Sequence, residues 1–209
     1  MLEIWGHMSS INVKKVVWAA QELGLDHERT EAGLHFGVTK TPEYLCMNPN
    51  SLVPVIDDGG FILWESNVIT RYLCAKHSPG NLYPQDLQTR FNAERWMEWQ
   101  QTTINPAGRD AFIQWVRTAP EQRSTEAIAK SVAATLPKLG MLDAHLAQSA
   151  FMAGDHFTMG DIPLGCEIHR WWGLPHEHSP RTAFPAIERW YAQLLARPAS
   201  KGVLDLPLS

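Results

Sequence analysis

The sequence predicts an α/β plus all-α fold class, in which a domain of strands and helices precedes an all-helical domain. Residues 1–78 alternate short strand-like runs with amphipathic segments. From residue 86 onward, apolar residues recur at steps of three and four, as they do on helices. Helix-breaking residues gather between the two patterns, in the run SPGNLYP. We therefore predict domains at 1–78 and 86–209, with a linker at 79–85.

The composition excludes several classes of function. With 209 residues, the chain is long enough for one or two domains that each bury a core. Its charged fraction is 19% and its formal net charge is -4, which favours neither a nucleic acid nor an anionic membrane as a partner. No apolar run approaches the roughly 20 residues of a membrane span, and Glu3 interrupts the first apolar run, unlike a signal peptide. We expect a soluble, cytoplasmic protein.

The first domain begins with a strand, a helix and a second strand. Strands are predicted at Leu2–Trp5 and His27–Thr30, and a short helix follows at Pro42–Met47. The first helix ends near Gly24, and its apolar face carries Val13, Val16, Val17 and Ala20. The loop HMSSIN at 7–12 leads into this helix, so two serines and an asparagine lie at a helix start. Such residues commonly cap helices.

A hairpin and a helix complete the first domain. We predict strands at Leu52–Asp57 and Phe61–Glu65, joined by a turn at 58–60. Pro54 has no backbone N–H, so it marks an edge, a bulge or an exposed backbone with which a peptide can pair. Ser66 is placed to cap the next helix, whose apolar face carries Val68, Ile69, Tyr72 and Leu73. A helix N-terminus beside an open strand edge suits a carboxylate.

Val53-Pro54, followed one hairpin later by Glu65-Ser66 and an amphipathic helix, resembles the glutathione-binding half of the glutathione S-transferase family. The resemblance implies a thioredoxin-like first domain and a cis peptide bond before Pro54. It also implies that Val53 pairs with the cysteinyl backbone of glutathione, and that Glu65 and Ser66 hold the γ-glutamyl end.

The partner of the glycyl carboxylate of glutathione stays open. Many members of the family carry a glycine and then a lysine or similar polar residue before the proline, where this chain has Ser51-Leu52. Leu52 has no group that binds a carboxylate. Lys40, His35 or a backbone group are the candidates, and affinity for glutathione is expected to be lower or differently distributed.

Conjugation needs the thiolate of glutathione at neutral pH, whereas a free cysteinyl thiol has a pKa of about 8.5. A hydroxyl that donates to the sulfur at the positive end of a helix stabilises the thiolate. The resemblance to serine-type members places this hydroxyl on Ser10, with Ser9 second, and Asn12 supplies another donor as in some bacterial relatives. The loop has no cysteine, which disfavours mixed-disulfide chemistry.

The second domain is predicted to contain helices only. They run from 86 to about 117 with an interruption at 105–108, then from 125 to 148, and again near the end of the chain. The run FTMGDI at 157–162 contains a capping box, in which Thr158 and Asp161 bind each other's backbone amides. The family carries such a box at about this place, and its role is structural.

The resemblance places a hydrophobic electrophile between the first loop and the first long helices of the second domain. Aromatic residues with a few polar neighbours suit such a ligand. The segment offers Trp96, Trp99, Gln100, Thr103, Asn105, Arg109, Phe112 and Trp115, and we select Trp99, Thr103, Arg109, Phe112 and Trp115. Arg109 also suits a substrate that carries a carboxylate.

No metal and no permanently bound cofactor are predicted. His169, His176, Glu177 and His178 lie close in sequence, but H-x-H in a loop rich in glycine and proline is typical of solvated histidines. The cysteines are widely spaced in apolar stretches, so we expect buried, reduced thiols at Cys46, Cys74 and Cys166.

Together these features predict a serine-type glutathione S-transferase, theta-like or of another bacterial cytosolic class. Its reaction is the conjugation of glutathione, as a co-substrate, to small hydrophobic electrophiles, which serves detoxification. The resemblance also implies a homodimer. Two alternatives stay open, namely a glutathione-dependent peroxidase or disulfide reductase, and a non-catalytic binding module that kept the fold.

Overall fold

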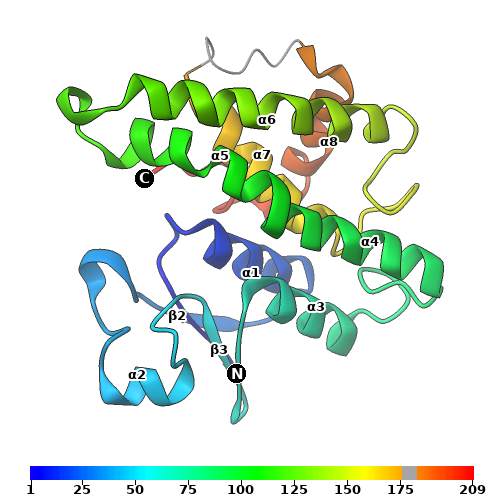
Figure 1. Ribbon diagram of the computed structural model, residues 1–209. Coiled ribbons are helices and arrows are strands. Elements are labelled where there is room, and N and C mark those ends of the chain that lie inside the picture. The colour runs from blue at the N-terminus through cyan, green and yellow to red at the C-terminus, as the bar shows by residue number, and fades with distance from the viewer. Residues whose placement is uncertain (176–182) are drawn as a thin grey trace.

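In the computed structural model, which describes residues 1–175 and 183–209, a small α/β domain and a helical domain lie one above the other (Figure 1). The first domain contains β1 (Leu2–Trp5), α1 (Ile11–Glu22), β2 (His27–Thr30), α2 (Pro42–Met47), β3 (Val55–Asp58), β4 (Phe61–Trp64) and α3 (Ser66–His77). The strand order is β2-β1-β3-β4, in which β1 is parallel to β2 and antiparallel to β3, and β3 is antiparallel to β4. This topology confirms the predicted thioredoxin-like class.

Helix α1 lies where the two domains meet. It packs on α3 of its own domain and on α7 (Asp161–Trp172) of the helical domain. Every residue from Val13 to Ala20 is buried, and this set includes Lys14 and Lys15. Because both sides of the helix are covered, these ammonium groups must find partners inside the protein. The packing also fixes the N-terminus of α1 at the junction of the domains.

The segment before β3 differs from the prediction. The strand begins at Val55, three residues later than predicted. The reason is that the Leu52 carbonyl accepts hydrogen bonds from Tyr44 Oη (2.8 Å) and Asn48 Nδ2 (2.9 Å), which hold it in a loop. The Val53-Pro54 peptide bond is cis, as the resemblance implied.

The predicted turn and the strand after it are each one residue too long. Gly59 and Gly60 alone form the turn, with φ values of 64° and 95°, as a two-residue hairpin turn requires. β4 ends at Trp64 because Glu65 adopts φ 74° and ψ 108°. Glu65, and not Ser66, is therefore the N-cap residue of α3, and no side chain caps this helix end. The first amides of α3 stay available to a ligand.

The helical domain contains α4 (Leu87–Trp99), α5 (Asn105–Phe112), α6 (Thr125–Leu146), α7 and α8 (Pro185–Leu195). The interruption predicted at 105–108 is wrong, because α4 and α5 are joined by a π-helical turn at Gln100–Ile104. A second π-helical turn, Ile113–Arg117, extends α5. Pro106 lies in the first turn of α5, where the missing N–H is tolerated.

Asp161, at the start of α7, joins three segments of the helical domain. Its carboxylate accepts hydrogen bonds from the amides of Thr158 (2.9 Å) and Met152 (3.0 Å) and from Trp190 Nε1 (2.9 Å). Burial raises the pKa of Asp161 to about 6. Half of the predicted capping box is thus confirmed. The Thr158 hydroxyl bonds to the Gly160 amide (3.3 Å) instead, because the Asp161 amide donates to the Thr158 carbonyl (3.0 Å).

The cysteines lie in different surroundings. Cys74 and Cys166 are buried, as predicted, and burial raises the pKa of each thiol to about 12. Cys46 is exposed, which contradicts the prediction, because the six-residue helix α2 buries only Tyr44.

Neither a membrane span nor a metal-binding cluster is found in the described parts of the chain. No helix there combines the length and hydropathy of a membrane span. No group of three or more potential metal ligands converges within residues 1–175 and 183–209. His169 contacts Lys14 (3.1 Å) and Tyr191 (3.1 Å). The rest of the predicted histidine cluster lies outside the described residues: His176, Glu177 and His178.

Candidate functional site

Two adjoining pockets open between the domains beside the N-terminus of α1. The first has a volume of about 310 Å³. The second, of about 710 Å³, shares Ser9 and Arg117 with the first, so the two form one interdomain site. We call the part of the first pocket that comes from the α/β domain the N-terminal wall and the part from the helical domain the helical wall. The N-terminal wall includes Ser10, Asn12 and Val53, and the helical wall includes Arg109, Arg117 and Arg170.

Ser10 presents an unengaged hydroxyl to this site. It is the N-cap residue of α1, yet its side chain makes no capping hydrogen bond, and its Oγ has no partner among the described residues. The unpaired amides of the first turn of α1 give this helix end a partial positive charge. An anion beside Ser10 therefore gains a hydroxyl hydrogen bond and the favourable end of the helix dipole.

Ser9, the second candidate, is already engaged. Its Oγ lies 2.7 Å from His7 Nδ1, and its carbonyl accepts from Arg117 Nη2 at 3.3 Å. Burial, followed by the charge of Arg117, lowers the pKa of His7, so this imidazole is neutral at pH 7. The geometry favours Ser10 over Ser9 as the donor to an anion.

A buried chain of hydrogen bonds starts at Asn12 on the N-terminal wall. Ser66 Oγ donates to Asn12 Oδ1 (3.2 Å) and accepts from Lys15 Nζ (3.5 Å). Lys15 also donates to Gln100 Oε1 (2.7 Å), at the junction of α4 and α5. Burial lowers the pKa of Lys15 to about 8, against an ordinary value of 10.5. Since Asn12 Oδ1 is occupied, its Nδ2 group is the part of the side chain left to donate to a ligand.

The same chain continues to the helical wall. Gln100 Nε2 donates to Glu167 Oε2 (2.6 Å), and Glu167 forms an ion pair with Arg170. Arg170 in turn donates to Asn105 Oδ1 (2.6 Å). Asn105 and Arg170 both line the pocket that Asn12 lines, so the chain begins and ends at the same site.

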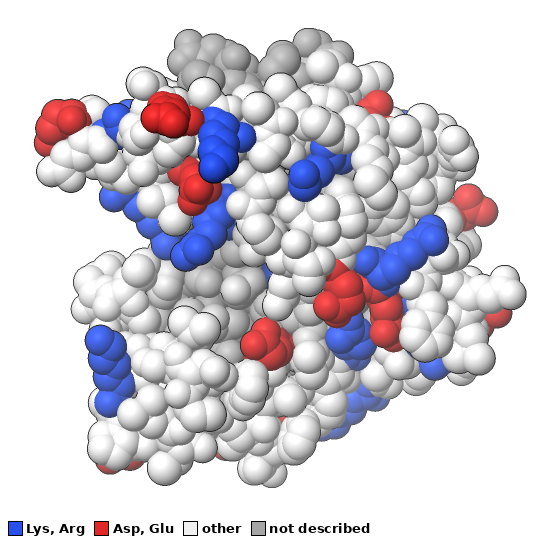
Figure 2. All heavy atoms as spheres, in the orientation of Figure 1, with Lys and Arg blue, Asp and Glu red and all other residues white. Residues whose placement is uncertain are grey.

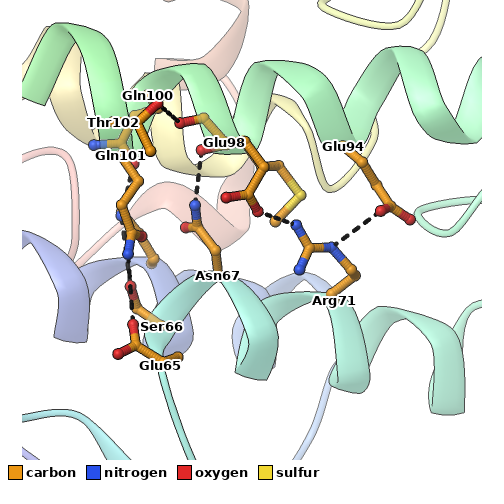
Figure 3. Close-up of polar contacts among 11 residues, drawn as sticks. Glu65, Ser66, Asn67, Arg71, Glu94, Glu98, Gln100, Gln101 and Thr102 are labelled. Atoms are coloured by element: carbon orange, nitrogen blue, oxygen red, sulfur yellow. Dashed lines mark hydrogen bonds and ion pairs between the residues drawn. The ribbon is translucent and has the colours of Figure 1, made fainter.

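Of the residues that the resemblance assigns to glutathione, only Val53 belongs to the N-terminal wall, and Pro54, Glu65 and Ser66 do not line the pocket. Val53 lines the pocket, and within the described residues no hydrogen bond engages its backbone amide or carbonyl. Pro54 is buried behind it. Glu65 is exposed at the start of α3 and accepts from Gln101 Nε2 at 3.4 Å (Figure 3). The Ser66 hydroxyl belongs to the buried chain, which leaves the Ser66 amide to bind a carboxylate.

Family models identify the chain. The model of the glutathione S-transferase N-terminal domain matches residues 1–75, and that of the C-terminal domain matches residues 125–193. The chain is 39% identical to the glutathione S-transferase GstB of Escherichia coli strain K12, with 100% of both chains covered. The chain belongs to the glutathione S-transferase family.

Solved structures of this family share the fold. The theta-class glutathione S-transferase of Xanthomonas axonopodis pv. citri with glutathione bound is similar at a TM-score of 0.94 and 40% identity, covering 100% of this chain and 99% of that one. A glutathione transferase of Burkholderia graminis, with two glutathione molecules bound per subunit, is similar at a TM-score of 0.87 and 28% identity, covering 99% and 88%.

Two of the five residues predicted for the electrophile line the interdomain pocket of this glutathione S-transferase. These are Arg109 and Phe112, both from α5. Trp99 packs edge-on against Trp96, and the Thr103 hydroxyl contacts the Thr102 hydroxyl. Neither Trp99 nor Thr103 lines the pocket. Trp115 lines a different pocket, near the start of α6.

The two side chains considered for the glycyl carboxylate are placed differently. His35 lines the larger pocket together with His7 and Ser9. Lys40 is exposed and lines neither pocket of the interdomain site. Leu52 is 64% exposed and lines the smaller pocket as an apolar residue. The geometry thus favours His35 over Lys40.

Sequence reasoning missed several polar residues of the site. Lys15, Arg117, Glu167 and Arg170 were not predicted, because each lies in a run that resembles an ordinary helix. One signal was present for Lys15, since two adjacent lysines interrupt the apolar segment of the first helix. For Arg117, Glu167 and Arg170, only the packing of α5 against α7 brings the groups together.

Proposed function

We propose that this glutathione S-transferase conjugates the thiolate of reduced glutathione to electrophiles that have an apolar body. The observation that carries the proposal is the unengaged Ser10 hydroxyl at the N-terminus of α1, inside a pocket to which both domains contribute. Full-length similarity to proteins named glutathione S-transferase supports the same reaction. In this proposal glutathione is a co-substrate and not a permanently bound cofactor.

Glutathione binds to the α/β domain in this proposal, from the N-terminal wall to the start of α3. The Val53 amide and carbonyl pair with its cysteinyl backbone. The Glu65 carboxylate binds the γ-glutamyl ammonium group, and the Ser66 amide with the start of α3 binds the γ-glutamyl carboxylate. His35 is the side chain that the pocket supports as partner of the glycyl carboxylate.

The thiolate forms beside Ser10. The Ser10 hydroxyl and Asn12 Nδ2 donate to the sulfur, and the α1 dipole favours the same negative charge. The pKa of the bound thiol is therefore lowered, and its proton passes to solvent at neutral pH. A shift of about two pKa units corresponds to about 2.7 kcal/mol. The sulfur then attacks an electrophilic carbon. A carbon–sulfur bond forms, the bond to the leaving group breaks, and the leaving group departs with its electron pair.

Conjugation is favoured over the two alternatives. Mixed-disulfide chemistry needs a thiol near the bound sulfur, and none of Cys46, Cys74 and Cys166 lines either pocket of the site. A binding module without chemistry has no need of an unengaged hydroxyl at a helix N-terminus. The Ser10 geometry therefore supports an enzyme.

We include a homodimer in the proposal. Large apolar side chains are exposed on β4, α3 and α4, where a monomer would normally bury them or replace them. They are Phe61, Trp64, Val68, Leu87 and Phe91. Sedimentation equilibrium tests this point, because a mass of one chain at micromolar concentration contradicts it.

The ultraviolet absorbance of the thiolate tests the central proposal. Bound glutathione is titrated against pH in the wild type, in Ser10→Ala and in Ser9→Ala. We expect thiolate well below pH 8 in the wild type and in Ser9→Ala, and loss of this shift in Ser10→Ala. Glutathione binding with no change of titration in either variant would disprove the assigned role of Ser10.

A further inference from the structure

Three guanidinium groups form the charged part of the helical wall. Arg109 lies in α5, Arg117 ends the π-helical turn that follows α5, and Arg170 lies in α7. All three line the same pocket as Ser10. In Figure 2, basic side chains gather along the helical side of the hollow between the domains. The steps assigned above to glutathione and its thiolate use none of these arginines.

Two of these cations have no carboxylate partner among the described residues. Arg170 pairs with Glu167, whereas Arg109 and Arg117 form no ion pair there. None of the residues that line the pocket is acidic. The like charges of Arg170 and Arg109, after burial, lower the pKa of Arg117, which shows that the three groups share one environment. The pocket therefore carries uncompensated positive charge.

The acidic side chain that lines the adjoining pocket does not compensate the charge of Arg109 and Arg117. Glu31 lines that pocket but pairs with Arg29 at 2.6 Å. Arg117 uses one hydrogen bond on the Ser9 carbonyl (3.3 Å), which leaves other N–H groups of its guanidinium unused.

Apolar side chains form another part of the pocket lining, beside the arginines and the neutral polar residues. The Phe112 ring centroid lies 5.0 Å from Arg117 Cζ and 5.1 Å from Arg170 Cζ, so the ring holds both guanidinium groups in place. Ile11 and Leu52 on the N-terminal wall, and Ile113 on the helical wall, add further apolar surface. A ligand that fits these surroundings has an apolar body and an anionic end.

We propose that the electrophile conjugated by this enzyme is itself an anion, with an apolar or aromatic body and a carboxylate bound by Arg109 and Arg117. The inference rests on the proposed function and narrows its substrate class. Guanidinium groups bind carboxylates through paired, charge-assisted hydrogen bonds. A neutral electrophile of the same shape cannot form these charge-assisted bonds with the two guanidinium groups, so the site discriminates against it.

Two other roles for these arginines lead to different results. If they bind the glycyl carboxylate of glutathione, their removal raises the KM for glutathione with every electrophile. If they only stabilise the thiolate, their removal slows anionic and neutral electrophiles equally. Only binding of an anionic electrophile changes the ratio between the two kinds of substrate.

The test uses a matched pair of electrophiles, 4-chloro-3-nitrobenzoate and 4-chloro-3-nitrobenzamide, which differ in charge and hardly in shape. The value of kcat/KM is measured for both in the wild type, Arg109→Gln, Arg117→Gln and the double variant. Arg95→Gln is the matched control, because Arg95 is exposed on α4 and lies outside the pocket. Each pocket variant is expected to lower the benzoate-to-benzamide ratio about tenfold and the double variant about 100-fold, with Arg95→Gln unchanged.

The outcomes separate this inference from the proposed function. An unchanged ratio in the double variant, or an equal loss for both electrophiles, overturns the anionic-substrate inference while conjugation itself stands. Turnover of neither electrophile by the wild type contradicts the proposed function. In that case, thermal shifts with the purified glutathione conjugates of both compounds still test the arginines, because only preferential binding of the carboxylate conjugate, lost in the double variant, agrees with the inference.

Discussion

The two walls of the interdomain pocket are built by different means. The N-terminal wall uses neutral hydrogen-bonding groups near the helix start of α1, with Ser10 and Asn12 only two residues apart. The helical wall uses charged side chains from separate segments, with Arg109 and Arg170 more than fifty positions apart in the sequence. The first wall depends on backbone geometry and the second on how helices pack.

This difference has a consequence for function. Groups fixed by a helix start have a defined position relative to the backbone, which suits the activation of one sulfur atom. Two arginines of the helical wall, Arg109 and Arg117, are exposed, so replacing them leaves the core untouched. Substitutions on the helical wall should change substrate preference, while those on the N-terminal wall should change the chemistry itself.

Removing the Ser10 hydroxyl should give the largest effect. In Ser10→Ala we expect kcat/KM at pH 7 to fall by about 10² to 10³ for every electrophile, because a single preorganised donor to the reacting anion is lost. The rate should recover as the pH rises toward the pKa of the free thiol. Steady-state kinetics from pH 6 to pH 9 provide the measurement.

Ser10→Thr is the matched control, because it keeps a hydroxyl at the same place. We expect it to retain most of the activity, and Ser9→Ala should stay near the wild type because Ser9 already bonds to His7. Equal losses in Ser9→Ala and Ser10→Ala would mean that the loop as a whole, and not one hydroxyl, activates the sulfur.

Breaking the buried chain at Lys15 should mainly change how stability depends on pH. Folding lowers the pKa of Lys15 from 10.5 to about 8, chiefly through burial. Between these values the unfolded chain binds a proton that the folded chain does not, so this group makes the unfolding free energy rise with pH. In Lys15→Met this rise is absent. The unfolding free energy of the wild type minus that of the variant should therefore increase by about 3 kcal/mol from pH 7 to pH 10.5.

Urea unfolding of both proteins at several pH values provides this measurement. The difference between the two proteins isolates Lys15, since all other titrating groups are common to them. Lys15→Gln is a second variant that keeps a polar group for Gln100, in case Lys15→Met folds poorly. A constant difference across this pH range would show that Lys15 keeps its ordinary pKa when buried.

Glu65 should affect glutathione binding more than the chemistry. In Glu65→Ala we expect the dissociation constant for glutathione to rise about tenfold, because one charge-assisted hydrogen bond to the γ-glutamyl ammonium is lost. Calorimetric titration measures it. The thiolate titration of bound glutathione should stay unchanged, in contrast to Ser10→Ala. A shifted thiolate titration in Glu65→Ala would remove the distinction between binding and activating residues within the α/β domain.

The N-terminal wall could be predicted from the sequence because its signals are local. Serines before an apolar helical run, and an acidic residue with a serine after a hairpin, are read from neighbouring positions, and the structure has Ser10 and Glu65 at helix starts. Local signals failed where distant groups intervene. The strand predicted from Leu52 starts at Val55 because the Tyr44 and Asn48 side chains hold the Leu52 carbonyl in a loop.

The helical wall and the buried chain could not be predicted, because they depend on which helices pack together. Lys15 looks like a solvated residue until α1 is covered on both sides. Glu167 and Arg170 are three positions apart on α7, as in many exposed helical pairs, yet both are buried. Arg117 is the last residue of the π-helical turn that extends α5, and such a turn has no clear sequence signature.

The smallest effect is expected from the exposed polar contacts between the domains. Arg71 of α3 pairs with Glu98 (2.7 Å) and Glu94 (3.7 Å) of α4, and Figure 3 shows Arg71 reaching across the interface toward both glutamates. The Glu98 side chain is 58% exposed, so solvent screens the pair. Arg71→Met should lower the unfolding free energy by less than about 1 kcal/mol, and less again at high salt. Urea unfolding at two salt concentrations measures this.

Asn67→Ala is the comparison within the same interface. Asn67 is buried and donates to the Met97 carbonyl at 2.8 Å, so its removal leaves that carbonyl without this partner. We expect a loss of about 1 to 3 kcal/mol that does not depend on salt. A larger loss in Arg71→Met than in Asn67→Ala would mean that the exposed ion pairs, and not the buried Asn67 hydrogen bond, contribute more to the packing of α3 against α4.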